Sequence, residues 1–307
     1  MKINGHHHIS MYTKDVKQNK DFYTNILGLR LVEISVNQDN PTMYHFFYGD
    51  EEGSPGTLLS FFEIPNASMT KKGTNSIHRL SLLVPDQAAL KYFEQRLNQH
   101  GIETHPIHYA GHDGLLFEDR DALEIVLLPN NDMPYPNTWK KNHYSDIPET
   151  YQILGMGPVE LRVRSIEKSA QFLTETLGYT RRIDSNIFTL DSNGLYSNFV
   201  VVEQDGHTVT PGRGYVHHIA VDVPGEQDLE ALIEKLDQLP GKHTAIIDRW
   251  FFKSVYYRQN GIMFEFATSG PGFMVDTKKE DLGKKLNLPA FLEKDRAEIL
   301  KALKPIE

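Results

Sequence analysis

The sequence predicts an α+β fold built from four repeated units, each a strand, a helix and further strands joined by tight turns. Two of the units share F-x-T-x-x-L-G, read at Phe22–Leu29 and again at Phe172–Tyr179. The other two share an apolar segment, since Ile77–Pro85 aligns without gaps on Val216–Pro224. The two kinds of unit alternate along the chain, and such internal repetition decides the architecture before any single motif does.

Each repeat contains a helix with a recognisable end. In F-x-T-x-x-L-G the Phe and Leu fall on one helix face, and the Gly stands where a helix is capped at its C-terminus. In the other pair of units, the apolar strand is followed by an amphipathic helix, expected at Ala88–Gln99 and at Gln227–Gln238.

The last strands of the units follow turn signals. Tight turns are expected at Asp119–Leu123, Ser192–Gly194 and Gln259–Gly261. They predict strands at Leu123–Leu128, Leu195–Val202 and Ile262–Ala267, and a longer Gly/Pro loop precedes the strand expected at Thr57–Glu63.

We therefore expect four segments along the chain. Residues 1–130 hold units 1 and 2, and a Pro/Asn-rich linker at 131–152 separates them from units 3 and 4 at 153–268. Residues 269–307 form a tail with a helix at about Leu292–Leu303.

Composition excludes several classes of function. A net charge of −9 gives no basic field for a polyanion, so nucleic acid is not an expected partner. The absence of cysteine excludes disulfides, thiolate ligands and a Cys nucleophile, and agrees with a reducing compartment. No apolar run approaches the roughly 20 residues of a membrane helix, and no signal-peptide core is visible. We expect a cytoplasmic protein without membrane contact.

Four such units in one chain resemble the vicinal-oxygen-chelate fold. This resemblance implies that the units pair to form two cupped mixed β-sheets, each cup a place where a metal can be held. The inward positions would be His8, Arg79, Glu160 and His218 on the first strands, and Ser60, Glu124, Asn198 and Glu265 on the last strands.

Pairing unit 1 with unit 4 gathers His8, His218 and Glu265, with Ser60 at the fourth corner. Two imidazoles and one carboxylate leave coordination positions open for substrate and dioxygen, which favours Fe(II), with Mn(II) as the alternative. Glu265 lies in an apolar strand, where a carboxylate is costly to bury without compensation.

Pairing unit 2 with unit 3 places Arg79 where a ligand would stand. We expect Arg79, Glu124, Glu160 and Asn198 to form a metal-free, ion-paired cluster, so that the chain binds one metal. Eight further histidines receive no role from the sequence, and most of them are expected on the surface or in loops, namely His45, His100, His105, His108, His112, His143, His207 and His243.

Structural explanations compete with this interpretation. A single buried histidine is more often structural than a ligand, and the run His6–His8 could be the remnant of a purification tag. Three candidates on equivalent positions of the repeats favour a metal centre.

Four segments carry a narrower resemblance, at Gly5–Ser10, Gly28–Val32, Gly53–Thr57 and Ala267–Phe273. They resemble the hydroquinone-type ring-cleaving dioxygenases of this fold. In that family the first and fourth units hold the metal, which implies His8, His218 and Glu265 and agrees with the choice made from the repeats. Catechol-cleaving relatives take ligands from the third and fourth units, and Glu160 in place of a histidine argues against that subgroup.

The resemblance also implies catalytic roles for His7, His217, Arg249, Tyr256 and Ser10. The family carries Thr where Ser10 stands, so the hydroxyl is kept. The implied activity is Fe(II)-dependent, extradiol-type ring cleavage of a hydroquinone-type or catechol-type aromatic diol with O2.

Two other functions remain open at this stage. A glyoxalase-like lyase or isomerase using zinc or nickel would favour a fourth strong ligand in place of Ser60. A non-catalytic protein that binds quinones or a drug would bind its ligand without consuming oxygen. The ring substituents and the physiological pathway stay open, quinone detoxification being suggested by resemblance alone, and so does the oligomeric state, a homo-oligomer included.

Overall fold

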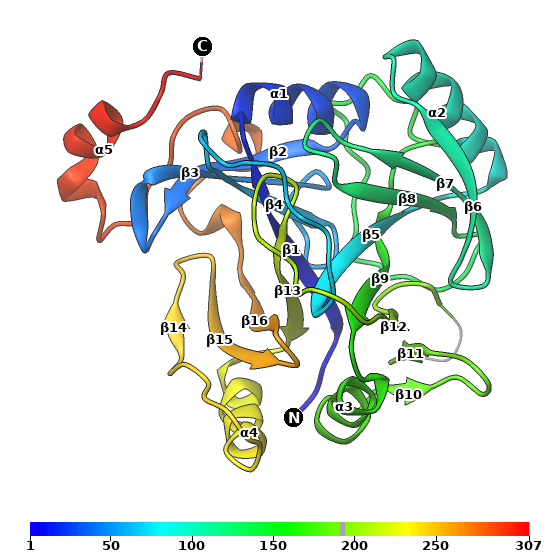
Figure 1. Cartoon of the computed structure of the whole chain (residues 1–307). Coiled ribbons are helices and arrows are strands. Elements are labelled where there is room, and N and C mark those ends of the chain that lie inside the picture. Colours follow the sequence, from blue (N-terminus) through cyan, green and yellow to red (C-terminus); the bar gives the residue numbers. More distant parts are fainter. Residues whose placement is uncertain (191–193, 307) are drawn as a thin grey trace.

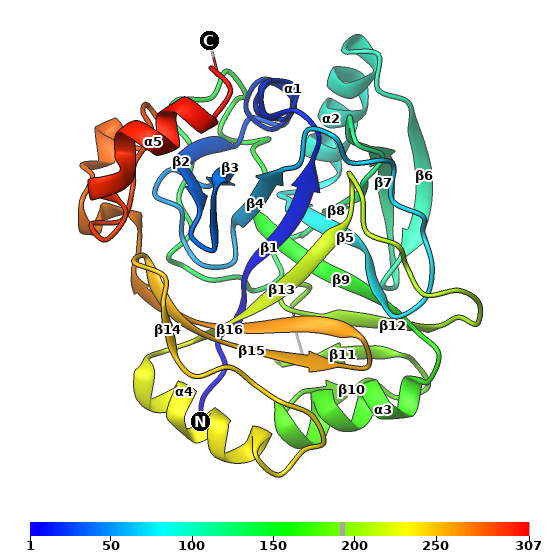
Figure 2. The same ribbon diagram turned by 60° about the vertical axis from the view of Figure 1, so that its left-hand side comes forward.

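The computed structural model of the chain describes residues 1–190 and 194–306, which form two eight-stranded mixed sheets with helices packed on them (Figure 1). The two sheets curve as separate cups, as the view in Figure 2 shows from a second side. The predicted α+β fold of four paired units is confirmed.

The first sheet combines units 1 and 4 in the order β14-β15-β16-β13-β1-β4-β3-β2. Unit 1 supplies β1 (Gly5–Thr13), β2 (Arg30–Asn37), β3 (Asn40–Gly49) and β4 (Leu58–Glu63). Unit 4 supplies β13 (Val216–Val223), β14 (Ile247–Asp248), β15 (Phe252–Gln259) and β16 (Ile262–Pro271). The antiparallel pair of β1 and β13 joins the two halves in the middle of the sheet.

The second sheet combines units 2 and 3 in the order β10-β11-β12-β9-β5-β8-β7-β6. Unit 2 supplies β5 (Ser76–Val84), β6 (Thr104–Tyr109), β7 (His112–Glu118) and β8 (Glu124–Pro129). Unit 3 supplies β9 (Gly155–Val163), β10 (Thr180–Arg181), β11 (Ile187–Thr189) and β12 (Phe199–Glu203).

One predicted strand is shorter than expected. The segment Leu195–Val202 becomes extended only at Phe199, because Ser197 has a φ of 67° and so lies in the left-handed region, which interrupts a strand. The turn expected at Ser192–Gly194 falls largely on residues 191–193, outside the described residues.

The repeated F-x-T-x-x-L-G segments widen into a π-helical turn. α1 (Val16–Lys20) continues into η1 (Asp21–Ile26), and α3 (Ile166–Gln171) into η2 (Phe172–Thr176). In the first, the Leu27 N–H donates to the carbonyl of Phe22, five residues back, where an α-helix would bond four back. Gly28 then ends the helix with a φ of 75°, the conformation that favours glycine.

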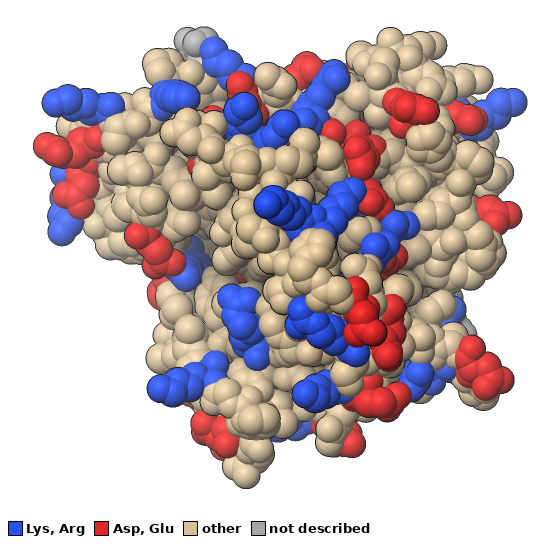
Figure 3. Space-filling model, in the orientation of Figure 1, with Lys and Arg blue, Asp and Glu red and all other residues tan. Residues whose placement is uncertain are grey.

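The amphipathic helices lie close to their predicted positions, at α2 (Gln87–Gln99) and α4 (Glu226–Leu236). Within residues 1–190 and 194–306, none of the helices combines the length and the apolar character that crossing a membrane requires. Positive and negative side chains are interspersed over the face drawn in Figure 3, so that face offers no extended basic surface.

The C-terminal tail closes the outer edge of the first sheet. It contains η3 (Phe273–Val275), η4 (Lys279–Asp281), η5 (Glu293–Asp295) and α5 (Arg296–Ala302). Asn287 N–H donates to the carbonyl of Ile34 over 2.8 Å, and the Ser35 hydroxyl donates to the carbonyl of Asn287 over 2.9 Å. The tail therefore occupies hydrogen-bonding groups that an exposed β2 would offer to another chain.

Candidate metal centre

The register of the first sheet places the three predicted ligands on one face. Ala220 of β13 pairs with His8 on one side and with Glu265 on the other, so these residues form one row across the sheet. The next row consists of Ser60, Ser10 and His218. Residues two apart along a strand point to the same face of the sheet, so both rows share one face. The residues between them, Ile9, Ile219 and Phe264, point to the opposite face, into the hydrophobic core.

The ligand atoms of this trio converge. Nε2 of His218 lies 2.8 Å from Oε2 of Glu265, Nε2 of His8 lies 3.1 Å from the same oxygen, and the two nitrogens are 3.2 Å apart. All three side chains are at most 4% exposed. In the described part of the chain, no other group of His, Asp or Glu side chains brings three ligand atoms this close together.

These separations test whether a metal ion fits. Metal–ligand bonds of about 2.1 Å put two ligand atoms about 3.0 Å apart at a right angle and about 3.4 Å apart at the tetrahedral angle. The observed 2.8–3.2 Å matches the right-angled case, which is the arrangement of three ligands on one face of an octahedron. The donor set and its spacing therefore fit a divalent transition-metal ion with open positions.

A second pair of histidines fixes the orientation of the first. Nδ1 of His7 lies 2.9 Å from Nδ1 of His8, and Nδ1 of His217 lies 2.7 Å from Nδ1 of His218. A ligand nitrogen must offer a lone pair, so as metal ligands through Nε2 both His8 and His218 would carry their protons on Nδ1 and donate to their neighbours. Burial lowers the pKa of both His7 and His217 to about 3, which keeps them neutral and able to accept.

Glu265 is held in its charged form from both ends. Burial alone would raise its pKa, but the neighbouring His8 and His218 lower the pKa well below its usual range. The hydroxyl of Tyr256 donates to Oε1 over 2.8 Å, which leaves Oε2 to face the imidazoles. Burial, and then the charge of Glu265, raises the pKa of Tyr256, so the phenol stays protonated and remains a donor.

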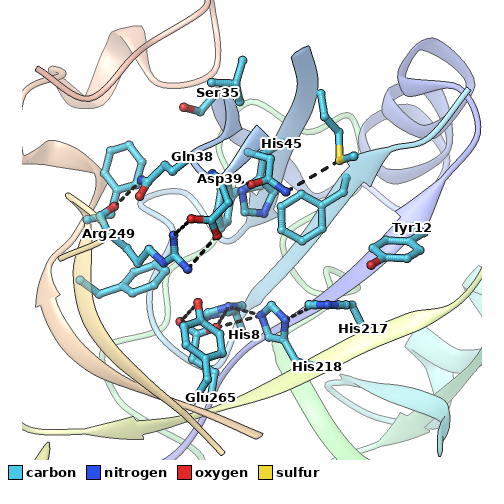
Figure 4. Close-up of a pocket in the computed structure, with 18 residues that line it drawn as sticks. His8, Tyr12, Ser35, Gln38, Asp39, His45, His217, His218, Arg249 and Glu265 are labelled. Atoms are coloured by element: carbon cyan, nitrogen blue, oxygen red, sulfur yellow. Dashed lines mark hydrogen bonds and ion pairs between the residues drawn. The ribbon is translucent and has the colours of Figure 1, made fainter. Parts of the chain in front are cut away.

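The trio opens into a cavity with about 790 Å³ of empty space, open solvent at its mouth included (Figure 4). Its apolar wall consists mainly of aromatic side chains from both units, namely Tyr12, Phe47, Phe62, Phe251 and Phe252. At the mouth, Arg249 forms an ion pair with Asp39 over 3.1 Å, and Gln38 donates to the carbonyl of Arg249 over 2.9 Å. The β2–β3 turn and the β14–β15 loop are thereby tied together across the entrance.

The other predicted catalytic residues divide into two groups. His217, Arg249 and Tyr256 contribute to the cavity wall. His7 and Ser10 are buried behind it, His7 against His8 and Ser10 with its hydroxyl 2.6 Å from that of Ser60. Any effect of these two residues on a bound ligand must pass through their neighbours.

His45 received no role from the sequence, as one of eight histidines of which most were expected on the surface or in loops, but it is one of the residues of the cavity wall. It lies on β3, lines the cavity, stacks on Phe62 with ring centres 3.9 Å apart, and has Nε2 3.1 Å from the Ser60 hydroxyl. The alternation of β3 could have revealed it, since Tyr44, Phe46 and Tyr48 enter the core while His45 and Phe47 face the other way.

The second sheet holds an ion-paired cluster in the corresponding place. Arg79 lies 2.6 Å from one oxygen of Glu124 and 3.4 Å from Glu160, whose other oxygen lies 2.7 Å from Arg162. Asn198 does not join this cluster as predicted. Its amide donates to the carbonyl of Gly194, and Val200 is the residue that pairs with Glu160.

Comparison with known proteins identifies a family model and relatives that match this chain over most of its length. Residues 5–127 and 155–268 match the family model described as the glyoxalase/bleomycin resistance protein/dioxygenase superfamily. The full chain is 40% identical to the full length of "Putative ring-cleaving dioxygenase MhqA" of Bacillus subtilis (strain 168). It is 27% identical to chlorohydroquinone/hydroquinone 1,2-dioxygenase of Sphingobium indicum, over 98% of this chain and 96% of that one.

Solved structures give the same grouping. A crystal structure described as a putative dioxygenase from Bacillus subtilis superposes with a TM-score of 0.89 at 30% identity, covering 100% of this chain and 98% of that one. Glyoxalase I from Zea mays superposes with a TM-score of 0.61 at 14% identity, over 86% of this chain and 92% of that one, a likeness of fold alone. The chain therefore belongs to the glyoxalase/bleomycin resistance protein/dioxygenase superfamily.

Proposed function

We propose that this protein is an Fe(II)-dependent, extradiol-type ring-cleaving dioxygenase that acts on a hydroquinone-type aromatic diol with O2. The observation that carries the proposal is the buried trio of His8, His218 and Glu265, which opens directly into an aromatic-lined cavity. Two relatives that match this chain over 96–100% of their own length support it, one named "Putative ring-cleaving dioxygenase MhqA" and the other chlorohydroquinone/hydroquinone 1,2-dioxygenase.

The trio would hold the metal. Fe(II) bound there would supply a redox-active Lewis acid for the reaction of the diol with dioxygen. With only three protein ligands, the trio leaves room for both. Ser60 does not act as a fourth, since its hydroxyl already contacts Ser10 and His45.

The cavity walls position an aromatic ring and exclude water. Phe252 lies edge-on to His7 and tilted over His8 with ring centres 5.2 Å apart, so a ring bound beside the metal ligands meets an apolar surface. Phe47 and Phe62 extend that surface toward β3. Removing water from such a site strengthens every charge interaction made inside it.

Charged and polar groups of the wall are suited to a ring that becomes anionic. The guanidinium of Arg249 lies over the Tyr256 ring at 5.4 Å, close enough to the trio to stabilise negative charge on a substrate oxygen. Because Nδ1 of neutral His217 accepts from His218, its proton is on Nε2, and this group can donate to an oxygen of the ring. Tyr256 and His217 are the groups we assign to hydrogen bonding and proton transfer.

The decisive experiment measures oxygen consumption by protein loaded anaerobically with Fe(II), with methylhydroquinone and catechol in parallel. Oxygen uptake with a new ring-cleavage chromophore is expected, faster with methylhydroquinone. Glu265→Ala should abolish it, and Glu124→Ala, the matched carboxylate of the second sheet, should not. Bound metal without oxygen uptake on either diol would overturn the proposal and favour a glyoxalase-like lyase.

A further inference from the structure

The far wall of the cavity contains a histidine in a third row of the first sheet. This row consists of His45, Phe62 and Tyr12, paired across β3, β4 and β1. It lies two rows from the one that holds His8 and Glu265, and Figure 4 shows His45 across the cavity from the trio. A planar ring that has one substituent at the trio would direct its opposite substituent toward this wall.

His45 has a ring nitrogen to spare, unlike the other polar side chains that the β2–β3 hairpin places in the wall. The Ser35 hydroxyl donates to Asn287 and Gln38 donates to Arg249. Asn37 caps its own turn and Asp39 pairs with Arg249. His45 uses Nε2 toward Ser60, and none of the hydrogen bonds among the described residues involves its Nδ1.

The hydroxyls behind His45 determine which of its nitrogens carries the proton. Ser10, Ser60 and His45 form a chain with contacts of 2.6 and 3.1 Å, and Ser10 is fully buried. If Nε2 of His45 donated to Ser60, the chain would end on a buried Ser10 O–H without an acceptor, which costs free energy. If Ser10 donates to Ser60 and Ser60 donates to Nε2, both hydroxyl hydrogens have an acceptor. His45 then carries its proton on Nδ1.

We propose that His45 is a specificity-determining residue, whose Nδ1–H donates to the oxygen substituent of a bound phenolic ring that lies opposite the metal-side oxygen. This inference rests on the proposed function in assuming that the ligand is an aromatic diol. It adds that the site selects para diols over ortho diols. The two oxygens of an ortho diol lie at the same end of the ring, and neither reaches His45.

The test is a set of dissociation constants measured without oxygen on Fe(II)-loaded protein, so no turnover is needed. Hydroquinone is compared with 4-methylphenol, in which a methyl group replaces the distal hydroxyl, and 4-methoxyphenol with 4-ethylphenol. A hydrogen bond of ordinary strength predicts that His45→Phe reduces each oxygen-over-carbon preference by about five- to tenfold. The preference for catechol over phenol should not change.

Variants separate His45 from its surroundings. Tyr12 lies in the same row as His45, and Tyr12→Phe removes its hydroxyl. This variant should leave the preference for hydroquinone over 4-methylphenol within about twofold of wild type. His45→Gln, which keeps an N–H donor, should retain part of the preference, and it is a second substitution should His45→Phe fail to fold. Met43→Leu is an apolar change in the same wall and should change the dissociation constants of all ligands by the same factor.

Each outcome decides the inference. Preferences unchanged in His45→Phe, or lost in Tyr12→Phe instead, would overturn it. Loss of the hydroquinone preference without loss of the 4-methoxyphenol preference would show that Nδ1 accepts, which contradicts the proton assignment. If no diol is ever cleaved but the preferences behave as expected, the proposed function fails and the recognition by His45 stands. If diols are cleaved and the preferences do not depend on His45, the proposed function stands and the recognition by His45 fails.

Discussion

Tyr256 and Glu265 occupy directly paired positions of β15 and β16, and the Tyr256 hydroxyl donates to Oε1 of Glu265 over 2.8 Å. The carboxylate is therefore fixed by one oxygen while the other faces His8 and His218. Such a hydrogen bond orients a ligand without contacting the metal itself.

Tyr256→Phe should weaken metal binding while leaving the fold intact. Loss of the hydrogen bond frees Glu265 to rotate, and removal of a partner of this kind typically lowers metal affinity by about 10- to 100-fold. Competition with a chelator of known affinity measures it. Tyr257→Phe is the control, because that hydroxyl donates to Pro240 away from the site. Equal affinities in both variants would show that Tyr256 does not orient Glu265.

Metal removal should lower the melting temperature of the protein. This effect should depend on Glu265 in the first sheet and not on Glu124 in the second. At a free metal concentration about 100 times the dissociation constant, binding adds about 2.7 kcal/mol to the free energy of unfolding. Wild type should therefore melt several degrees higher with Fe(II) or Mn(II) than with a chelator, as followed by circular dichroism. Glu265→Ala should lose this difference and Glu124→Ala should keep it. A metal-dependent shift that survives Glu265→Ala would place the metal elsewhere.

Arg249 should matter more to turnover than its partner Asp39 does. Removing a charge that stabilises a developing anion commonly costs about 100-fold, so Arg249→Met should lower kcat/KM by about that factor. Asp39 is largely exposed, and such ion pairs contribute at most about 1 kcal/mol, so Asp39→Asn should change kcat/KM by less than about tenfold. Steady-state oxygen consumption measures both. A fully active Arg249→Met would exclude a role for this charge.

The contribution of Asp119 to the stability of the protein should fall as pH rises from about 4 to about 6. Burial raises the pKa of Asp119 from 3.8 to about 6, so the folded chain holds a proton that the unfolded chain releases in this interval. The part of the free energy of unfolding that depends on this group then decreases with pH, by at most about 3 kcal/mol. The buried, neutral His7 and His217 act in the opposite direction, so the effect of Asp119 must be measured against a matched variant. Urea unfolding at pH 4 and pH 6.5 measures the change.

Asp119→Asn provides the matched comparison, because the amide oxygen can still accept from the N–H groups of Asp121 and Leu123. The amide does not titrate, so the free energy of unfolding of the wild type minus that of the variant should fall between pH 4 and pH 6.5, by more than it does for any exposed Asp→Asn change. An identical slope in wild type and variant would mean that Asp119 is ionised in the folded state at pH 4.

The metal trio could be predicted from sequence because each ligand belongs to a short pattern that the repeats place in register. His8 and His218 follow from the first strands of units 1 and 4, and Glu265 from its distance to a turn glycine. The same counting failed at Asn198, because the left-handed backbone of Ser197 delays the start of β12. The position of a strand residue can be counted from the preceding turn only where the chain between the turn and that residue is extended.

His45 could not be assigned by the same reasoning. Its position on an alternating strand was readable, but its distance from the trio depends on how strongly the sheet curves from β3 to β13. Curvature results from packing across the whole sheet and leaves no local pattern in the sequence. The ion pair of Asp39 with Arg249 was missed for the same reason, since it joins two loops at opposite edges of the cup.

The pairing of the first unit with the last determines when the metal site can exist. His8 and His218 are separated by 210 residues, which a ribosome takes about 10 to 40 seconds to add. Throughout that interval, β1 has neither β13 beside it nor a second imidazole near His8. The nascent chain cannot assemble the trio before Glu265 has been made, so any metal held by all three side chains would have to bind after that point. A chain truncated before β16 would be made without Glu265 and would be expected to leave its two histidines without a metal.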